Sequence, residues 1–148
     1  MRTLLAAVLV AFLGVTACSP ALSGKIDVAD AEIVAPPPGV PTAAGYVKIS
    51  NGTAKPVRLI GGTTEVAERV EIHQMSMDGG VMRMRQLSEG VEIPSAGSVI
   101  FSPNGMHLML IGWKAPLKGT MVGVTLNFAD APPIDVQFAL KALGGHEH

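Results

Sequence analysis

The sequence has a single cysteine, Cys18, and few aromatic residues, and each shortage excludes a class of site. One cysteine leaves no partner for a disulfide and no cluster of thiolates for a structural zinc site. Aromatics make up only 4% of the 148 residues, so we expect a core of Val, Ile, Leu, Ala and Met. The other soft sulfur ligand is well supplied, since the chain contains 8 methionines.

An excess of charge of one sign is also lacking. The 11 basic and 12 acidic residues give a formal net charge of −1, without a run of like charges. Nucleic-acid-binding domains usually carry a basic patch, so we expect no nucleic-acid partner. The sequence also lacks the Gly-x-Ser-x-Gly elbow of many hydrolases. We therefore expect a binding protein and not an enzyme.

The one long hydrophobic run, from Leu4 to Leu13, follows Arg2 and is too short to span a bilayer. This arrangement is typical of a secretion signal. It ends in Val15-Thr16-Ala17-Cys18, which resembles a bacterial lipobox, whose cysteine is acylated after cleavage. We expect a signal peptide over residues 1–17 and lipidation at Cys18, with a tether over residues 18–25. The domain would then be periplasmic or otherwise extracytoplasmic, and held to the membrane by its lipid alone. An ordinary signal peptide with an incidental cysteine is the alternative.

Residues 26–142 predict one all-β domain, followed by a histidine-containing tail over residues 143–148. Short apolar segments alternate with turn-forming residues, and no stretch keeps the apolar spacing of a long helix. Such spacing favours a two-sheet sandwich or a Greek-key barrel. We expect strands at Ile26–Val34, Ala44–Ser50, Val57–Gly61, Arg69–Met75, Val81–Gln86, Val91–Ile93, Ser98–Phe101, His107–Trp113, Thr120–Phe128 and Ile134–Leu140.

Two segments, His73 to Met84 and Met106 to Met109, combine histidine with methionine. Side chains two residues apart on a strand share a face, so each His-x-Met pair should emerge together. The glycine turn after Asp78 should fold the next strand back alongside. We therefore expect neighbouring strands to bring two imidazoles and several thioethers together. The candidate ligands are His73, Met84, His107 and Met109, with Met75 and Met77 as auxiliary candidates.

This set of ligand types favours monovalent copper. Cu(I) is soft and prefers thioether and imidazole, whereas Mg, Ca and Mn prefer oxygen and zinc prefers Cys, His or carboxylate. Thioethers carry no proton that would compete with the metal. A blue-copper electron carrier would need a cysteine ligand, and Cys18 is assigned to the lipid. Any one methionine can instead fill a gap in the core, and this alternative stays open for Met82, Met106 and Met121.

The spacing of these residues resembles the periplasmic copper chaperones called PCu(A)C. Their signature is a histidine, ten residues, a methionine, about twenty-one residues and then His-x-Met. Here ten residues separate His73 from Met84, and twenty-two separate Met84 from His107-Leu108-Met109. We expect the additional residue in the turn Leu87–Gly90. Further segments that resemble the family are Ala43–Tyr46, Val70–His73, Asp78–Arg85, Glu92–Pro94 and Gly112–Leu117.

The resemblance implies a cupredoxin-like Greek-key β-sandwich with an accessible Cu(I) site. It also implies delivery of copper to the binuclear copper site of a respiratory oxidase. The expected partner is the copper subunit of that oxidase, or another copper chaperone. We expect the site at an exposed edge, where the ligands of an acceptor can enter. A periplasmic buffer or resistance protein that sequesters copper without delivering it is the alternative. Some family members carry a second copper site in a longer tail, and His146 and His148 are candidates for a weak Cu(II) or Zn(II) contact.

Overall fold

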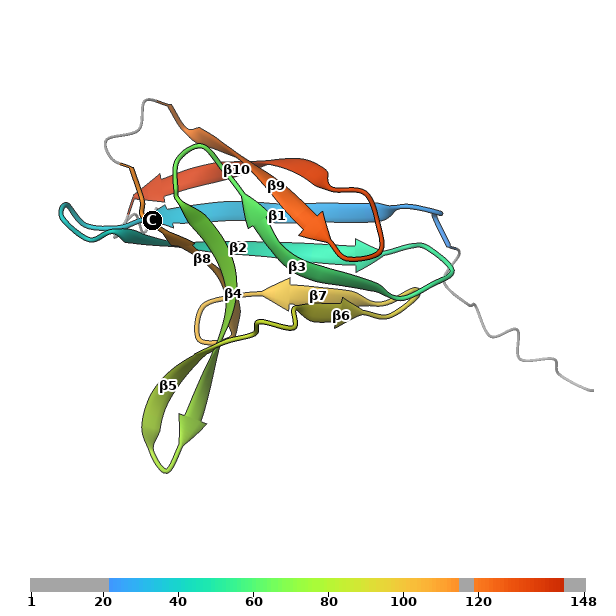
Figure 1. The fold of residues 1–148 in the computed structure, drawn as a ribbon, viewed down its shortest axis with the longest axis horizontal. Coiled ribbons are helices and arrows are strands. Elements are labelled where there is room, and N and C mark those ends of the chain that lie inside the picture. The colour runs from blue at the N-terminus through green and yellow to red at the C-terminus, as the bar shows by residue number, and fades with distance from the viewer. Residues whose placement is uncertain (1–21, 115–118, 143–148) are drawn as a thin grey trace, which may run out of the picture.

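The computed structural model describes residues 22–114 and 119–142, and their regular structure is entirely β (Figure 1). No helix in this described part is long and apolar enough to cross a membrane. The all-β prediction is therefore confirmed. The ten strands are β1 (Ile26–Ala35), β2 (Thr42–Asn51), β3 (Val57–Thr63), β4 (Arg69–Asp78), β5 (Val81–Gln86), β6 (Val91–Ile93), β7 (Ser98–Phe101), β8 (Met106–Ile111), β9 (Met121–Phe128) and β10 (Ile134–Ala142).

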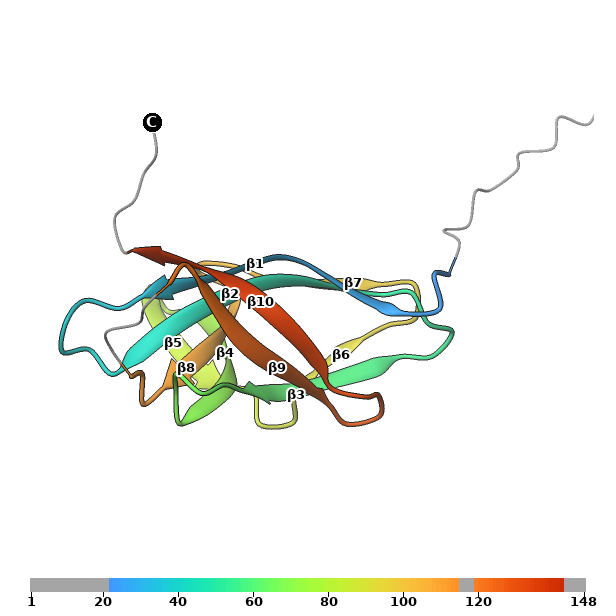
Figure 2. The same cartoon turned by 90° about the horizontal axis from the view of Figure 1, so that it is seen from above.

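The strands form a Greek-key sandwich that closes on itself. Their order is β5-β4-β8-β2-β1-β10-β9-β3-β6, and β7 pairs with the second half of β2. β1 and β10 are parallel, and the other pairings described are antiparallel. One bridge between Gly62 and Val70 joins β3 to β4. In Figure 2, β1 and β7 lie on one side of the molecule and β3 on the other. β5 is left at the end of the strand order with one partner, β4.

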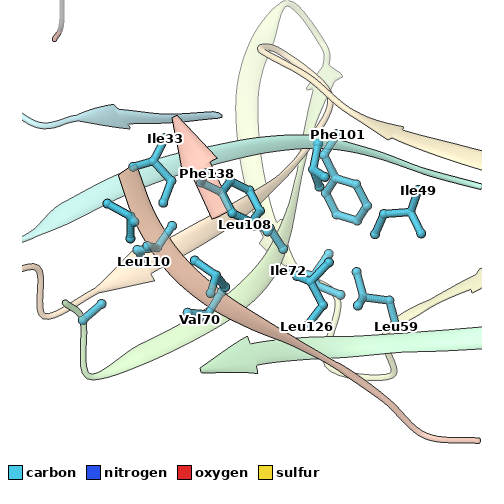
Figure 3. Close-up of a cluster of buried hydrophobic side chains, with 14 of the residues drawn as sticks. Ile33, Ile49, Leu59, Val70, Ile72, Phe101, Leu108, Leu110, Leu126 and Phe138 are labelled. Carbon is cyan, nitrogen blue, oxygen red and sulfur yellow. The ribbon is translucent and has the colours of Figure 1, made fainter. Parts of the chain in front are cut away.

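Alternating side chains of both layers form one core (Figure 3). In β9, for example, Val122, Val124 and Leu126 are buried while the residues between them are more exposed. Each such side chain contributes about 1.5–3 kcal/mol by leaving water. The expectation that methionine helps to fill the core is wrong for the described residues. Their buried hydrophobic core contains no methionine, and Met106 alone among the methionines packs against it, half-buried.

Most strands begin or end one to three residues away from their predicted bounds, and glycine explains two of the differences, in β8 and β4. β8 ends at Ile111 and not at Trp113, because Gly112 has a φ of +72° that side-chain-bearing residues rarely adopt. β4 runs on to Asp78 because Gly79 and Gly80, with φ of +56° and +80°, make a two-residue hairpin turn. Met77 consequently lies within β4. The turn also fixes the register of β4 against β5.

Candidate metal centre

The outer face of β4 and β8 carries the two histidines. Val70 and Ile72 of β4 and Leu108 of β8 point into the core and are at most 7% exposed. Because side chains alternate along a strand, His73 and His107 emerge on the opposite face. The apolar residues that anchor these strands in the core therefore also set the direction in which the imidazoles point.

The two imidazoles face each other across the strand pair. His73 is directly opposite His107 in the register of β4 and β8, and the ring centroids are 6.1 Å apart with an interplanar angle of 39°. Metal–imidazole bonds are about 2.0–2.1 Å long. With about 1.1 Å from nitrogen to ring centre, two rings that share one ion can have centres up to about 6.4 Å apart. The observed separation fits one shared metal ion.

Hydrogen bonds leave one nitrogen of each ring available. His107 Nδ1 lies 3.2 Å from the Gly105 carbonyl oxygen, which can only accept, so Nδ1 carries the proton and Nε2 keeps its lone pair. His73 Nε2 lies 3.0 Å from Oε2 of Glu71. The other nitrogen, His73 Nδ1, is buried and has no hydrogen-bond partner among the described residues. A metal-binding histidine typically donates a hydrogen bond to a carboxylate or a carbonyl oxygen from the ring nitrogen that does not bind the metal. Both histidines make such a bond here.

Glu71 is a functional candidate that the sequence reasoning did not single out. The hydrogen bond from His73 lowers the pKa of the Glu71 carboxyl, and the nearby charge of Arg69 lowers it further, against the opposing effect of burial. Arg69 Nε lies 3.1 Å from Oε1 of Glu71. A signal was present in the sequence, because a residue two positions before His73 on a strand must share its face. Glu71 therefore holds one imidazole from behind.

The methionines lie on either side of the imidazole pair. Met109, two residues from His107 on β8, is half-buried and directly opposite Glu71. Met84, on β5, is 49% exposed and directly opposite Met75. The register thus places Met109 next to the imidazole pair and Met84 one strand further out, on a diagonal from His73. All four candidate ligands share one face of the sheet.

The imidazoles are less exposed than expected. His107 is 7% exposed, and the His73 side chain is 13% exposed. The reason is the strand order, because β8 lies between β4 and β2, and β4 lies between β8 and β5. Of the candidate strands, β5 alone is at the end of the strand order. We expected the whole site at an exposed edge. Of the four candidate ligands, only Met84 lies on an edge strand.

The remaining methionines of the hairpin also follow this face. Met75 is half-buried, and Met77 and Met82, which are directly opposite each other, are 65% and 44% exposed. Met121, on β9, is 51% exposed. The alternative that a methionine fills a gap in the core therefore holds for Met106 and is wrong for Met82 and Met121. Within the described residues, no three side chains from His, Cys, Asp and Glu form a group that could hold a metal ion.

Other predicted positions lie outside the described residues. These are the signal peptide over 1–17, Cys18 with residues 19–21 of the tether, residues 115–118 of the segment that begins at Gly112, and the tail with His146 and His148.

Comparison with known proteins identifies the family. The family model described as "Putative lipoprotein LpqE-like" matches residues 26–140. The chain belongs to the LpqE-like family. A relative, "Putative lipoprotein Lxx21020" of Leifsonia xyli subsp. xyli (strain CTCB07), is 32% identical over 145 residues, covering 90% of this chain and 86% of the relative.

Solved structures show the same fold as this LpqE-like chain. A copper-bound PCuAC domain from PmoF2 superimposes with a TM-score of 0.67 at 24% identity, over 81% of this chain and 95% of that one. The solution structure of CuI-DR1885 from Deinococcus radiodurans gives a TM-score of 0.61 at 29% identity, over 75% of this chain and 74% of that one. The resemblance to the PCu(A)C family and the cupredoxin-like fold expected from it are confirmed.

Proposed function

We propose that this LpqE-like protein is an extracytoplasmic copper chaperone, which binds Cu(I) through His73, His107, Met109 and Met84 and passes it to a cuproprotein. The observation that carries the proposal is the imidazole pair 6.1 Å apart, in which hydrogen bonds leave Nδ1 of His73 and Nε2 of His107 as the free nitrogens. Copper is the cargo in this proposal, and the protein performs no catalytic turnover.

The donor types favour Cu(I) over harder metals. Two neutral imidazoles and uncharged thioethers supply soft ligands without adding negative charge, which suits a monovalent soft ion. The similar PCuAC domain of PmoF2 is described as copper-bound, and DR1885 as bound to Cu(I). Both names support copper as the cargo of this chain.

The unequal exposure of the ligands is consistent with transfer to another protein. The buried imidazoles would hold the ion, whereas Met84 is half-exposed on a strand with one partner. An incoming thioether or imidazole of an acceptor can replace Met84 first, without the sheet opening. Delivery to the binuclear copper site of a respiratory oxidase subunit, or to another copper chaperone, fits this access.

We also propose that the protein is held to the membrane by a lipid on Cys18 after cleavage of residues 1–17. The lipobox-like sequence supports this location, and the name of the Leifsonia relative agrees with it. The folded domain would begin near residue 26 and end near residue 142, and any copper contact of His146 and His148 would be additional.

The test is direct transfer of copper. The domain, loaded with one equivalent of Cu(I) without oxygen, is mixed with an apo oxidase copper domain, the two are separated, and copper in each is measured. We expect copper to move to the acceptor. The variant Met109→Leu should bind Cu(I) about tenfold more weakly, a loss of about 1.4 kcal/mol, and Met121→Leu should behave as the wild type. Binding without transfer would favour the buffer function, and equal binding by Met109→Leu would remove Met109 from the site.

A further inference from the structure

We propose a second Cu(I) site, built from thioethers alone, on the β4–β5 hairpin. Met75, Met77 and Met82 form it, and Met84 lies between it and the imidazole pair. The proposal rests on the proposed function only for the direction of copper movement, since the hairpin site can exist without the first site.

The register of the hairpin aligns the sulfurs in two facing pairs. Met75 is directly opposite Met84, and Met77 is directly opposite Met82. The four positions are consecutive on one face, with no other residue type between them. The opposite face carries polar residues, with Ser76 opposite Arg83 and Arg83 Nε 3.4 Å from Asp78. The hairpin thus has a thioether face and an opposite face that is polar except for Val81 at the turn.

The spacing of these pairs suits one metal ion. Facing Cβ atoms in an antiparallel pair are about 4.5–5.5 Å apart, and residues two apart along a strand are separated by about 6.8 Å. The centre of the rectangle is therefore about 4 Å from each Cβ. A methionine side chain and a metal–sulfur bond of about 2.3 Å reach that point easily. Three or four thioethers can thus meet at one Cu(I) ion.

Packing does not account for these methionines. Met77, Met82 and Met84 are 65%, 44% and 49% exposed, and none of the four packs against the buried core. Figure 1 shows why, because the hairpin of β4 and β5 extends beyond the body of the sandwich. Exposed apolar side chains that cluster in this way usually mark a binding site. Thioethers in water also remain free to bind a soft ion.

Glycine fixes the arrangement. The turn at Gly79 and Gly80, both with positive φ, sets Asp78 opposite Val81. A slip of one residue would move Met82 and Met84 to the polar face and separate them from Met75 and Met77. The turn therefore specifies the sulfur cluster as well as the hairpin.

Met84 connects the two sites. It faces Met75 in the hairpin cluster and is diagonal to His73 in the imidazole site. Cu(I) can pass between the sites while it keeps its bond to Met84. Bonds to the imidazoles break as bonds to Met75, Met77 or Met82 form, and the ion stays in the +1 state throughout. The hairpin would then be the site at which copper enters or leaves the protein.

The test compares anaerobic Cu(I) titrations of the full chain and the double variant Met77→Leu/Met82→Leu, with a chromophoric Cu(I) chelator as competitor. Leucine keeps the apolar character and approximate volume of methionine, so the fold should be unchanged by circular dichroism. We expect two equivalents for the wild type and one for the double variant. The affinity for the one equivalent of Cu(I) that the double variant still binds should stay within about threefold of the wild-type affinity. Met121→Leu, which removes an exposed methionine elsewhere, should bind two.

A second measurement separates the two proposals. X-ray absorption of His107→Ala loaded with one equivalent of Cu(I) should show sulfur ligands only, because the hairpin still binds. In the titration, binding of one equivalent of Cu(I) by the wild type, or of two equivalents by the double variant, would overturn the hairpin site. A wild-type spectrum without nitrogen ligands at any loading would instead overturn the imidazole site and leave the hairpin site standing.

Discussion

Replacing Glu71 by alanine should weaken copper binding although Glu71 is not proposed as a ligand. Glu71 Oε2 accepts a hydrogen bond from His73 Nε2 at 3.0 Å, and this bond leaves Nδ1 of His73 as the nitrogen for the metal. Without the carboxylate, the ring can rotate or change tautomer. Part of the population would then present an N–H to the metal instead of a lone pair.

The expected loss follows from the position of Glu71 behind a ligand. Removal of such a partner typically lowers metal affinity by 10- to 100-fold. That range corresponds to about 1.4–2.7 kcal/mol. Arg69 also contacts Glu71, through Nε at 3.1 Å, but its side chain is 61% exposed. The variant Arg69→Ala should therefore weaken binding by less than about fivefold, because an exposed ion pair contributes at most about 1 kcal/mol.

The assay is a competition titration of Cu(I) against a chromophoric chelator without oxygen. Glu92→Ala is the matched control, because it removes the same charge from a surface pair with Arg58, at 3.0 Å, on strands outside the site. It should bind copper as the wild type does. Wild-type affinity in Glu71→Ala would refute the role assigned to Glu71 and, with it, the assignment of Nδ1 as the binding atom of His73.

Three further outcomes follow from the fold, the electrostatics and the proposed anchor. Asn51 is 1% exposed, and its Nδ2 donates to the carbonyl oxygens of Lys55 and Ile93 at 2.8 and 3.0 Å. Asn51→Ala should therefore lower the free energy of unfolding, measured in urea, by about 2–3 kcal/mol. A loss below about 0.5 kcal/mol would contradict this expectation. Because the pKa of Glu71 is lowered in the fold, its carboxylate stabilises the protein at neutral pH, and this stabilisation is lost as the pH falls through the lowered pKa. The stability difference between wild type and Glu71→Gln should thus shrink from pH 7 to pH 3, and a constant difference would argue against an ionic origin. Cys18→Ser should release the protein from the membrane fraction and leave Cu(I) affinity unchanged, whereas continued membrane association would contradict the lipid anchor.

Most of the fold could be predicted because strong turn signals separate the apolar segments that form the strands. The alternation of apolar residues in β9 and the glycine pair after Asp78 both act locally, so the sequence alone is sufficient to locate them. The end of β8 could not be predicted in the same way. It depends on the positive φ of Gly112, which lies beside the Glu68 side chain, and this contact forms only in the folded chain.

The sequence could predict which candidate ligands share a face of the sheet, but not how deeply the imidazoles are buried. Strand alternation indicates that His107 and Met109 share a face, whichever strands lie beside them. The burial of His107 depends on β8 lying between β4 and β2, and this order joins segments that are distant in the sequence. The contact between Glu71 and His73 required one rotamer of each residue, which alternation leaves open. The described core contains no methionine, and Phe101, Phe128 and Phe138 fill it together with aliphatic side chains.

The preference of the imidazole and thioether site for Cu(I) over Zn(II) is the central claim, and a competition titration of the mature domain tests it most directly. The protein is loaded with Cu(I) without oxygen and then exposed to a tenfold excess of Zn(II). We expect Cu(I) to remain bound, because thioethers are good ligands for Cu(I) and poor ligands for zinc. Displacement of Cu(I) by Zn(II), or no binding of Cu(I) at all, would contradict the claim.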